Sequence, residues 1–504
     1  MKKIISVLMC VILTACIFFP LTAHGYSQSC PFIYIHGFMG KDLYSDKNDK
    51  DSEPVWPPST DKILDLVKAH IGDLLLFLVT KDYDRLGDAI LDPVNDLLSS
   101  ANLSKDGEVT DSSGAYMVYP PADSIKADSC LDFNYDWRVD PIQSAQELND
   151  FINYVTENSG CDKVAIECHS FGGIIVNTYT KLYGSDKLRS ICYNTTAIYG
   201  ETYTGEMMSG EIVFEGEAIV EFFKKMLGGN EYEKLLTGLI DILAGAGIDN
   251  DLAELANNIV EHLGERAIRD ILMPMFGGWL SIWAMVPDKY VDSAKDFVFG
   301  KVYKDDGIDR SKLIEKIDRY NTEIRPYKTE TLEKQNKEIS IYVFSRYGFP
   351  SVPLTPSWKK MSDAVVDTES SSFGATCAEF GSTVYEKLDA SADNSYLNPD
   401  NTIYAGTCMF KDQTWFFRNM PHADMCGDMD EIVKALLYSD GQATVKTFKE
   451  YPQYMVYDKS DKSISIDNGT PEIKESFFDK IFAFNIKILE FFRNIYDKIF
   501  SVFK

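Results

Sequence analysis

Basic residues are scarce in this chain of 504 residues, which has 50 lysines and arginines against 77 aspartates and glutamates. The formal net charge of −27 argues against a role in nucleic-acid binding, because that role needs a surplus of cations. It argues equally against docking on anionic lipid by charge alone. Any attraction to a membrane would therefore use aromatic and aliphatic surface, and the acidic surface itself mainly favours solubility.

Cysteine spacings typical of a metal site are also lacking, so we expect no zinc. Internal repeats and low-complexity tracts do not stand out, and we found no sign of a fibrous or disordered chain. With 45% hydrophobic and 13% aromatic residues, the chain can bury a large core. One enlarged domain and two packed units both fit this length.

A hydrophobic run at residues 4–19 follows two lysines and ends at a proline, as in a signal peptide. It is shorter than the roughly 20 residues that a membrane-spanning helix needs. We therefore predict that residues 1–25 form a signal peptide and that the protein is secreted or held at the cell surface. The sequence Leu13-Thr14-Ala15-Cys16 resembles a bacterial lipobox, so a lipoprotein anchored at Cys16 is the alternative.

The most informative motif is Cys168-His169-Ser170-Phe171-Gly172-Gly173, which lies between the mainly apolar segments 163–167 and 174–176. A serine at a sharp turn between a strand and a helix is typical of the nucleophile elbow of serine hydrolases. Such a turn raises the hydroxyl above a parallel sheet and aims the following helix at the developing oxyanion. We predict that Ser170 is the nucleophile. Cys168 stands where the motif normally has glycine.

An early loop with glycines at positions 37 and 40 follows the apolar segment 32–35. Catalysis of acyl transfer needs two N–H donors aimed at the position where negative charge develops. We assign these donors to the backbone of Phe38 and Phe171, and we expect His36 and Gly37 to support the loop. A plain turn at the end of a strand is the alternative interpretation.

Histidine is rare, with six in the chain, and this scarcity narrows the choice of a catalytic base. In α/β-hydrolases the triad runs serine, acid, histidine along the chain, and only His262 and His422 follow Ser170. His262 lies in a segment with the pattern of an exposed helix, whereas His422 follows a short aromatic strand and a turn. We predict that His422 is the base and that His169 is structural.

Asp363 is our candidate for the triad acid. It lies in Ser362-Asp363-Ala364-Val365-Val366, which resembles the S-D-G-x-V turn that holds this aspartate and follows the apolar segment 339–344. Its carboxylate would accept the ring N–H of His422 and stabilise the imidazolium. Asp367 and Glu369 are alternatives, and Ala364 replaces the customary glycine.

The segment Asn134-Tyr135-Asp136-Trp137-Arg138 matches the Y-D-W-R sequence of the lecithin:cholesterol acyltransferase-like family of lipid acyl hydrolases and transferases. It lies between the predicted oxyanion loop and the elbow, as in that family. Segments 53–56 and 276–287 match the family more weakly. The chain therefore resembles this family. The resemblance implies a lipid or other ester substrate, with Asp136, Trp137 and Arg138 supporting the site, and the mechanism implies no cofactor.

Short β-branched and aromatic runs alternate with helical stretches along the chain, which predicts an α/β-hydrolase fold with a mostly parallel sheet flanked by helices. Two segments, residues 26–200 and 336–450, would form this core. Between them, residues 201–335 have apolar residues at helical spacing and predict a large helical cap or lid insertion. The apolar faces of this insertion serve either the cap's own core or contact with a membrane.

Residues 451–504 are predicted to be a C-terminal tail that ends in an amphipathic helix at residues 477–503. Its broad aromatic face and mixed charges are typical of an interfacial helix, which would contact a membrane surface or a lipid droplet. A helix packed on the protein's own surface has the same pattern. The sequence does not predict an oligomeric state.

Together these features predict a secreted serine lipid acyl hydrolase or acyltransferase that works through an acyl-enzyme on Ser170. Hydrolysis and acyl transfer share that intermediate and differ only in the acceptor. A non-lipid esterase or a peptidase is the enzymatic alternative. A catalytically inactive surface-binding protein on a hydrolase fold is the other, and Cys168 and Ala364 motivate it.

Overall fold

The computed structural model describes residues 28–59, 82–213, 266–389 and 391–469, together with residues 261–263 and scattered positions between 62 and 80. The predicted signal peptide at residues 1–25, its alternative anchor Cys16 and the predicted helix at residues 477–503 all lie outside the described residues. Those three predictions therefore stay predictions.

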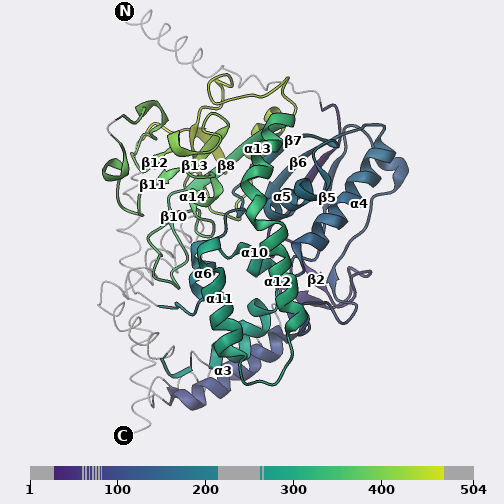
Figure 1. Cartoon of the computed structure of the whole chain (residues 1–504), viewed down its shortest axis with the longest axis vertical. Coiled ribbons are helices and arrows are strands. Elements are labelled where there is room, and N and C mark those ends of the chain that lie inside the picture. Colours follow the sequence, from purple (N-terminus) through teal and green to yellow (C-terminus); the bar gives the residue numbers. More distant parts are fainter. Residues whose placement is uncertain are drawn as a thin grey trace, which may run out of the picture.

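An eight-stranded sheet forms the centre of the molecule (Figure 1). Its strand order is β15-β14-β13-β8-β7-β6-β1-β5, and every neighbouring pair is parallel except β14 and β15. The strands are β1 (Phe32–Ile35), β5 (Cys130–Phe133), β6 (Val164–His169), β7 (Leu188–Asn194), β8 (Ser340–Tyr347), β13 (Thr414–Arg418), β14 (Tyr454–Asp458) and β15 (Ser463–Ile466). The predicted α/β class, with a mostly parallel sheet flanked by helices, is confirmed.

Helices cover both faces of this sheet, and the alternation of side chains along the strands decides which residues meet which helices. On one face Ile33 and Ile166 join a core with α4 (Pro141–Ser159) and α5 (Gly172–Tyr183). Figure 1 shows α4, α5 and α13 (Lys328–Glu338) across this face, where α5 contacts both of its neighbours. On the other face Phe32 and Ala165 pack with α15 (Gly427–Leu437).

Local sequence sets the ends of α4, the longest helix of the described chain. The Asp140 carboxylate accepts a hydrogen bond from the Ile142 N–H, and Pro141 occupies the first turn, where a missing N–H does no harm. At the other end Gly160 has a φ of 72°, the left-handed conformation that ends many helices. These caps direct the chain into β6 and the elbow that follows it.

Within residues 201–335 the structure describes residues 201–213, 261–263 and 266–335, which are largely helical, and the rest of the predicted cap lies outside the described residues. A π-helical segment at Ile268–Gly277 contacts α3 (Tyr83–Leu98) and α10. The α-helices here are α6 (Thr202–Met208), α10 (Leu280–Met285), α11 (Val291–Phe297) and α12 (Ser311–Glu323), which lie together beside the sheet in Figure 1. The predicted domain boundaries at 200 and 335 stay predictions.

Small secondary structures surround the sheet. They are the three-stranded antiparallel sheet of β2 (Leu43–Tyr44), β3 (Pro54–Trp56) and β4 (Gly114–Ala115), the pairs β9 (Phe349–Pro350) with β10 (Met361–Ser362) and β11 (Thr376–Cys377) with β12 (Ile403–Tyr404), and helix α14 (Thr368–Ser371). A search of the described helices for one with the length and apolarity to cross a bilayer found none.

The start of α5 packs against backbone so closely that only glycine fits. A Cβ on Gly172 would lie 2.6 Å from the carbonyl oxygen of Ile35 and 2.8 Å from that of His36. We expect Gly172→Ala to lower the free energy of unfolding by about 1–3 kcal/mol, because backbone cannot move aside cheaply. Chemical denaturation measures this change.

Gly427 provides the matched control, since it is the first residue of α15 as Gly172 is of α5. A Cβ there would meet nothing within 4 Å, so Gly427→Ala should leave the free energy of unfolding within about 0.5 kcal/mol of wild type. Equal effects of the two substitutions would contradict this account of the packing.

Candidate active site

Ser170 directly follows β6 in a backbone conformation that is unusual for a residue with a side chain. Its φ is 55°, in the left-handed region, and the side chain is 5% exposed. Its N–H donates to the Asn194 carbonyl at 3.2 Å, and its own carbonyl accepts from Gly173 at 3.1 Å and Ala197 at 3.2 Å. These hydrogen bonds hold the chain in a conformation that costs about 1 kcal/mol, as at many functional sites.

The loop after β1 passes directly over this serine. A Cβ on Gly37 would lie 2.5 Å from the Ser170 Cβ and 3.0 Å from its Oγ. The glycine at position 37 is thus required by contact with the side chain of Ser170. The structure brings together the two loops that the sequence predicted to meet.

Cys168, the residue in place of the motif's first glycine, is fully buried in the core between the sheet and the α4–α5 layer. Its thiol donates to the Cys192 carbonyl of the neighbouring strand, with 3.6 Å between sulfur and oxygen. Burial also raises the pKa of this thiol well above its usual value, with Glu167 adding to the effect. The cysteine is therefore an inert packing residue that the elbow accommodates.

His422 and Asp363 form a hydrogen-bonded pair. The Nδ1 atom of His422 lies 2.7 Å from Oδ2 of Asp363, and the His422 N–H donates to the Asp363 carbonyl at 2.9 Å. Since the carboxylate accepts, Nδ1 carries the ring proton. The remaining ring nitrogen of His422, Nε2, is then the one that can act as a base.

The Asp363 carboxylate is completely buried, yet it is well supplied with donors. Its Oδ1 accepts from the Val365 N–H at 3.0 Å and the Val366 N–H at 2.6 Å, and its Oδ2 accepts from the Thr195 hydroxyl. Burial acts to raise the pKa of this carboxyl, but His422 and these hydrogen bonds outweigh burial and lower the pKa below its usual value. Asp363 is therefore ionised beside His422.

The turn that carries Asp363 shows why a glycine is customary there. Ala364 has a φ of 82°, and its N–H donates to the Ser362 hydroxyl at 2.9 Å. The alanine thus adopts the backbone that glycine adopts more easily. Of the three carboxylates that were candidates for the triad acid, Asp363 is the one bonded to His422. Asp367 accepts hydrogen bonds from Thr202 and Lys360. Glu369 accepts one from Lys360.

The histidine that precedes Ser170 packs against the predicted base. The rings of His169 and His422 lie 4.6 Å apart between centroids, and the Nε2 of His169 donates to the His422 carbonyl at 3.0 Å. Burial, with the charges of His422 and Arg346, lowers the pKa of His169 well below its usual value. His169 is thus neutral and structural in its contacts, as predicted.

The hydroxyl of Ser170 is not hydrogen-bonded to the His422 ring among the described residues. In enzymes without substrate this hydrogen bond is often long and tightens in the substrate complex. His169 links the two segments, because it is the last residue of β6, directly before Ser170, and its ring packs against that of His422.

The loop of the predicted oxyanion donors is held by buried side chains. His36 is 2% exposed, its ring stacks on Tyr135 at 4.3 Å, and the Tyr135 hydroxyl donates to the His36 carbonyl at 2.7 Å. Burial lowers the pKa of His36 to about 4, so its ring is neutral at physiological pH. In the part of the chain that the structure describes, the N–H groups of Phe38 and Phe171 have no hydrogen-bond partner.

Trp137 contacts that loop, whereas Arg138 bonds to Asp136 and to residues 101 and 113 outside it. Arg138 is fully buried and forms an ion pair with Asp136 at 2.6 Å. The indole N–H of Trp137 donates to the Lys41 carbonyl at 2.9 Å, and its ring meets Phe38 edge to face at 4.8 Å. These contacts agree with a supporting role, and none of them reaches the hydroxyl of Ser170.

Several buried polar residues lie behind the site and were not predicted to do so from the sequence. They include Thr195, Asn194, Arg346 and Glu167. The available signal was a charged residue inside an otherwise apolar strand, since buried charges need partners. Arg346 in β8 and Glu167 in β6 both have this signature.

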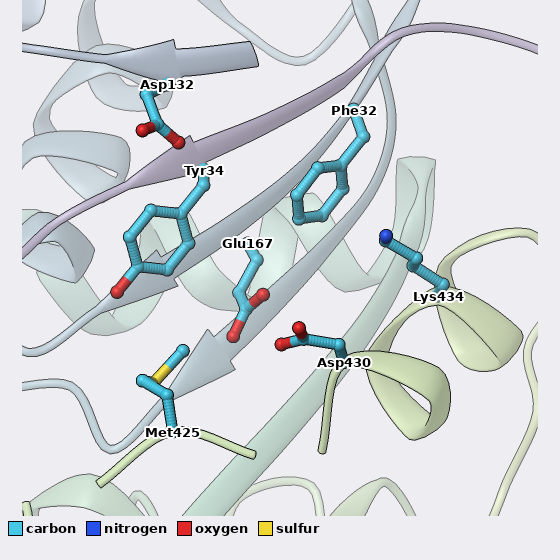
Figure 2. Close-up of a pocket in the computed structure, with 7 residues that line it drawn as sticks. All are labelled: Phe32, Tyr34, Asp132, Glu167, Met425, Asp430 and Lys434. Atoms are coloured by element: carbon cyan, nitrogen blue, oxygen red, sulfur yellow. The ribbon is translucent and has the colours of Figure 1, made fainter. Parts of the chain in front are cut away.

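Glu167 faces a pocket of about 280 Å³ on the α15 side of the sheet. Figure 2 shows its carboxylate between the hydroxyl of Tyr34 and the carboxylate of Asp430. Burial raises the pKa of Glu167 to about 7. A hydrogen bond from Asn194 acts to lower this pKa, and the negative charge of Asp430 acts to raise it further. The pocket is lined by Phe32, Tyr34, Asp132, Glu167, Met425, Asp430 and Lys434.

Comparisons with known proteins identify no family for this chain. No family model matches it, and no curated protein matches it either. Among solved structures, the crystal structure of the Tle4–Tli4 complex matches with a TM-score of 0.25 and 14% sequence identity, over 63% of this chain and 75% of that one. A similarity this low carries no argument about function, and the resemblance to the lecithin:cholesterol acyltransferase-like family stays a prediction.

The raised pKa of Glu167 makes the stability of the protein depend on pH. Its ordinary value is 4.5 and its value in the fold is about 7, a difference worth about 3 kcal/mol. The contribution of Glu167 to the free energy of unfolding is fully present below pH 4.5 and is lost as the pH rises through 7. The reason is that its carboxyl ionises more easily in the unfolded chain than in the fold.

Glu167→Gln should remove this loss while it keeps an oxygen that accepts from Asn194. The free energy of unfolding of the variant should therefore exceed that of wild type by up to about 3 kcal/mol above pH 7, and by much less near pH 4.5. Denaturant unfolding over this pH range measures the difference. A difference that does not change with pH would contradict the assignment.

Proposed function

We propose that the protein is a serine hydrolase of the α/β-hydrolase type that acts on carboxylic esters through an acyl-enzyme. The observation that carries the proposal is the Asp363–His422 pair, whose histidine ring packs against that of His169, the residue before an elbow serine with a φ of 55°. A strained serine, a buried ionised carboxylate and a histidine bonded to that carboxylate are the parts of a catalytic triad.

The reaction follows from these parts. Ser170 Oγ attacks the carbonyl carbon of the ester, and the free ring nitrogen of His422 takes its proton. Asp363 stabilises the imidazolium that forms, and the N–H groups of Phe38 and Phe171 bind the oxyanion. His422 then gives the proton to the leaving alcohol, and water, or another alcohol in a transferase, releases the acyl group from Ser170.

Aromatic side chains pack together around Phe38 of the predicted oxyanion loop. The ring of Phe38 lies 5.8 Å from that of Trp279, the residue directly before α10. Trp137 contacts both rings, and Trp56 lies 6.0 Å from Trp137. Trp137 and Trp279 are fully buried in the core, so the proposal of a lipid acyl hydrolase or transferase rests on the resemblance to lipid acyltransferases.

The two substitutions that motivated an inactive binding protein do not favour it. Cys168 packs in the core with its thiol bonded to Cys192, and Ala364 adopts the left-handed conformation that the turn requires. Neither residue displaces Ser170, Asp363 or His422. A secreted or cell-surface location, and membrane or lipid-droplet contact through residues 477–503, complete the proposal.

Ester hydrolysis by the purified protein tests the proposal, with a short-chain soluble ester, phospholipid dispersions and triglyceride dispersions as substrates. We expect Ser170→Ala to reduce kcat to background, because the nucleophile is lost. Release of fatty acid should rise when the lipid aggregates. A rate that ignores aggregation would favour a soluble esterase, and activity that survives Ser170→Ala would reject the triad.

The identity of the acid is tested by comparing Asp363→Asn with Asp367→Asn. Asparagine at 363 removes the charge and favours the wrong tautomer of His422, so kcat should fall by about ten-thousand-fold. Asparagine at 367 should change kcat far less, because Asp367 bonds to Thr202 and Lys360. The reverse order of effects would assign the acid to Asp367.

A further inference from the structure

Arg346 is a fully buried cation in β8, a strand that is otherwise apolar or uncharged. Its Nη1 lies 2.8 Å from the carbonyl oxygen of Pro421, 2.8 Å from that of His422 and 2.9 Å from that of Asp424. All three carbonyls belong to the short connection between β13 and α15 that carries His422. A single buried guanidinium thus donates hydrogen bonds to three backbone carbonyls of this loop.

The other terminal nitrogen of the guanidinium is held from the neighbouring strands. Nη2 donates to Oδ1 of Asn194 at 3.3 Å, and Nδ2 of Asn194 donates to Oε1 of Glu167 at 2.8 Å. These residues lie on β8, β7 and β6, three adjacent strands of the sheet. A chain of hydrogen bonds therefore runs from Glu167, three residues before Ser170 in the sequence, to the loop of His422.

Arg346 makes no ion pair with a carboxylate of the described residues. Burial lowers the pKa of its guanidinium, and the negative charges of Asp363, Glu167 and Asp424 act against this. A charge placed in a core without a direct partner is expensive, so carbonyl and amide oxygens must satisfy it. Here those oxygens belong to the loop that bears the predicted base.

The peptide groups of His422 are fixed on both sides. The backbone N–H of His422 donates to the Asp363 carbonyl, and the His422 carbonyl accepts from Arg346 and from His169. With Nδ1 bonded to Asp363, the ring has little freedom left. A base that is displaced by about 1 Å can lose about a hundred-fold in rate, so this restraint has a catalytic consequence.

We propose that Arg346 is a positioning residue for His422, acting through the carbonyls of residues 421–424 while Asn194 and Glu167 hold its guanidinium in place. The proposal rests on the proposed function, because it treats His422 as the base. Arg346 touches neither the ring of His422 nor the nucleophile in this arrangement. Its effect on the reaction passes through the backbone of the loop.

A guanidinium suits this place better than an ammonium. Its planar fork presents separate nitrogens, so one can serve the loop while the other binds Asn194. A lysine in its place has a single nitrogen, which can reach the carbonyls or Asn194 but not both. Methionine has similar length and no donor at all. The three side chains therefore form a graded series.

The experiment compares Arg346→Lys, Arg346→Met and a matched control, Arg325→Met. Arg325 is also buried, at 7% exposure, and donates to the carbonyls of Trp283 and Val286, but it lies among the helices of residues 280–327. Each variant is first shown to unfold cooperatively. The measured quantities are kcat and KM for a short soluble ester and the NMR signal of the His422 ring N–H.

We expect kcat of Arg346→Met to fall by about a hundred-fold with KM within twofold of wild type, and that of Arg346→Lys to fall by about ten-fold. The ring N–H signal, which depends on the bond to Asp363, should broaden or vanish in Arg346→Met. Arg325→Met should lose stability but keep the kcat of the folded protein and the ring signal. This pattern separates positioning from a merely structural role.

Several results would overturn the proposal. They are an unchanged kcat or ring signal in Arg346→Met, an equal loss of kcat in Arg325→Met, or wild-type kcat and ring signal in Arg346→Lys. If Arg346→Met fails to fold, Arg346→Lys decides by the same criteria. Failure of the proposed function has a different signature, namely no Ser170-dependent hydrolysis by wild type, and the ring signal then still tests the positioning of His422.

Discussion

The contact between the loop after β1 and Ser170 is the constraint on which the rest of the site depends. Gly37 approaches Ser170 and Gly172 approaches the Ile35 carbonyl so closely that neither position accepts a Cβ. This packing places Gly37, the residue before the predicted oxyanion donor Phe38, against the serine. The strained φ of Ser170 is held because the two loops and the parallel strands β1 and β6 leave the elbow no other conformation.

Behind the elbow, the buried groups Asp363 and Arg346 bond both to the backbone and to side chains such as Thr195 and Asn194. Asp363 accepts from the N–H groups of its own turn, and Arg346 donates to the carbonyls of the His422 loop. A buried charge of this kind is costly unless every partner is in place. The same contacts that stabilise Asp363 and Arg346 in the core also fix the His422 loop, so stability and the geometry of the proposed triad depend on one network.

Ser170, His422 and Asp363 could be proposed from the sequence alone. Only two histidines follow the elbow serine, and the turn of Asp363 has a recognisable pattern. The sequence favoured Asp363 and left Asp367 as an alternative. The hydrogen bond to His422 that distinguishes the two is visible only in the fold, because four residues separate them and both are buried. The link of Glu167, Asn194 and Arg346 depends on the order and register of β6, β7 and β8, which local patterns do not encode. The parallel sheet followed from alternation of strands and helices.

Covalent labelling tests the central claim, that Ser170 is an activated nucleophile, most directly. A fluorophosphonate reacts with such a serine by forming an Oγ–P bond and releasing fluoride, and peptide mass spectrometry locates the modified residue. The account predicts that the label lies on Ser170 in wild type and is lost in His422→Ala. A folded protein that stays unlabelled, or that is labelled elsewhere with Ser170 unmodified, would contradict it.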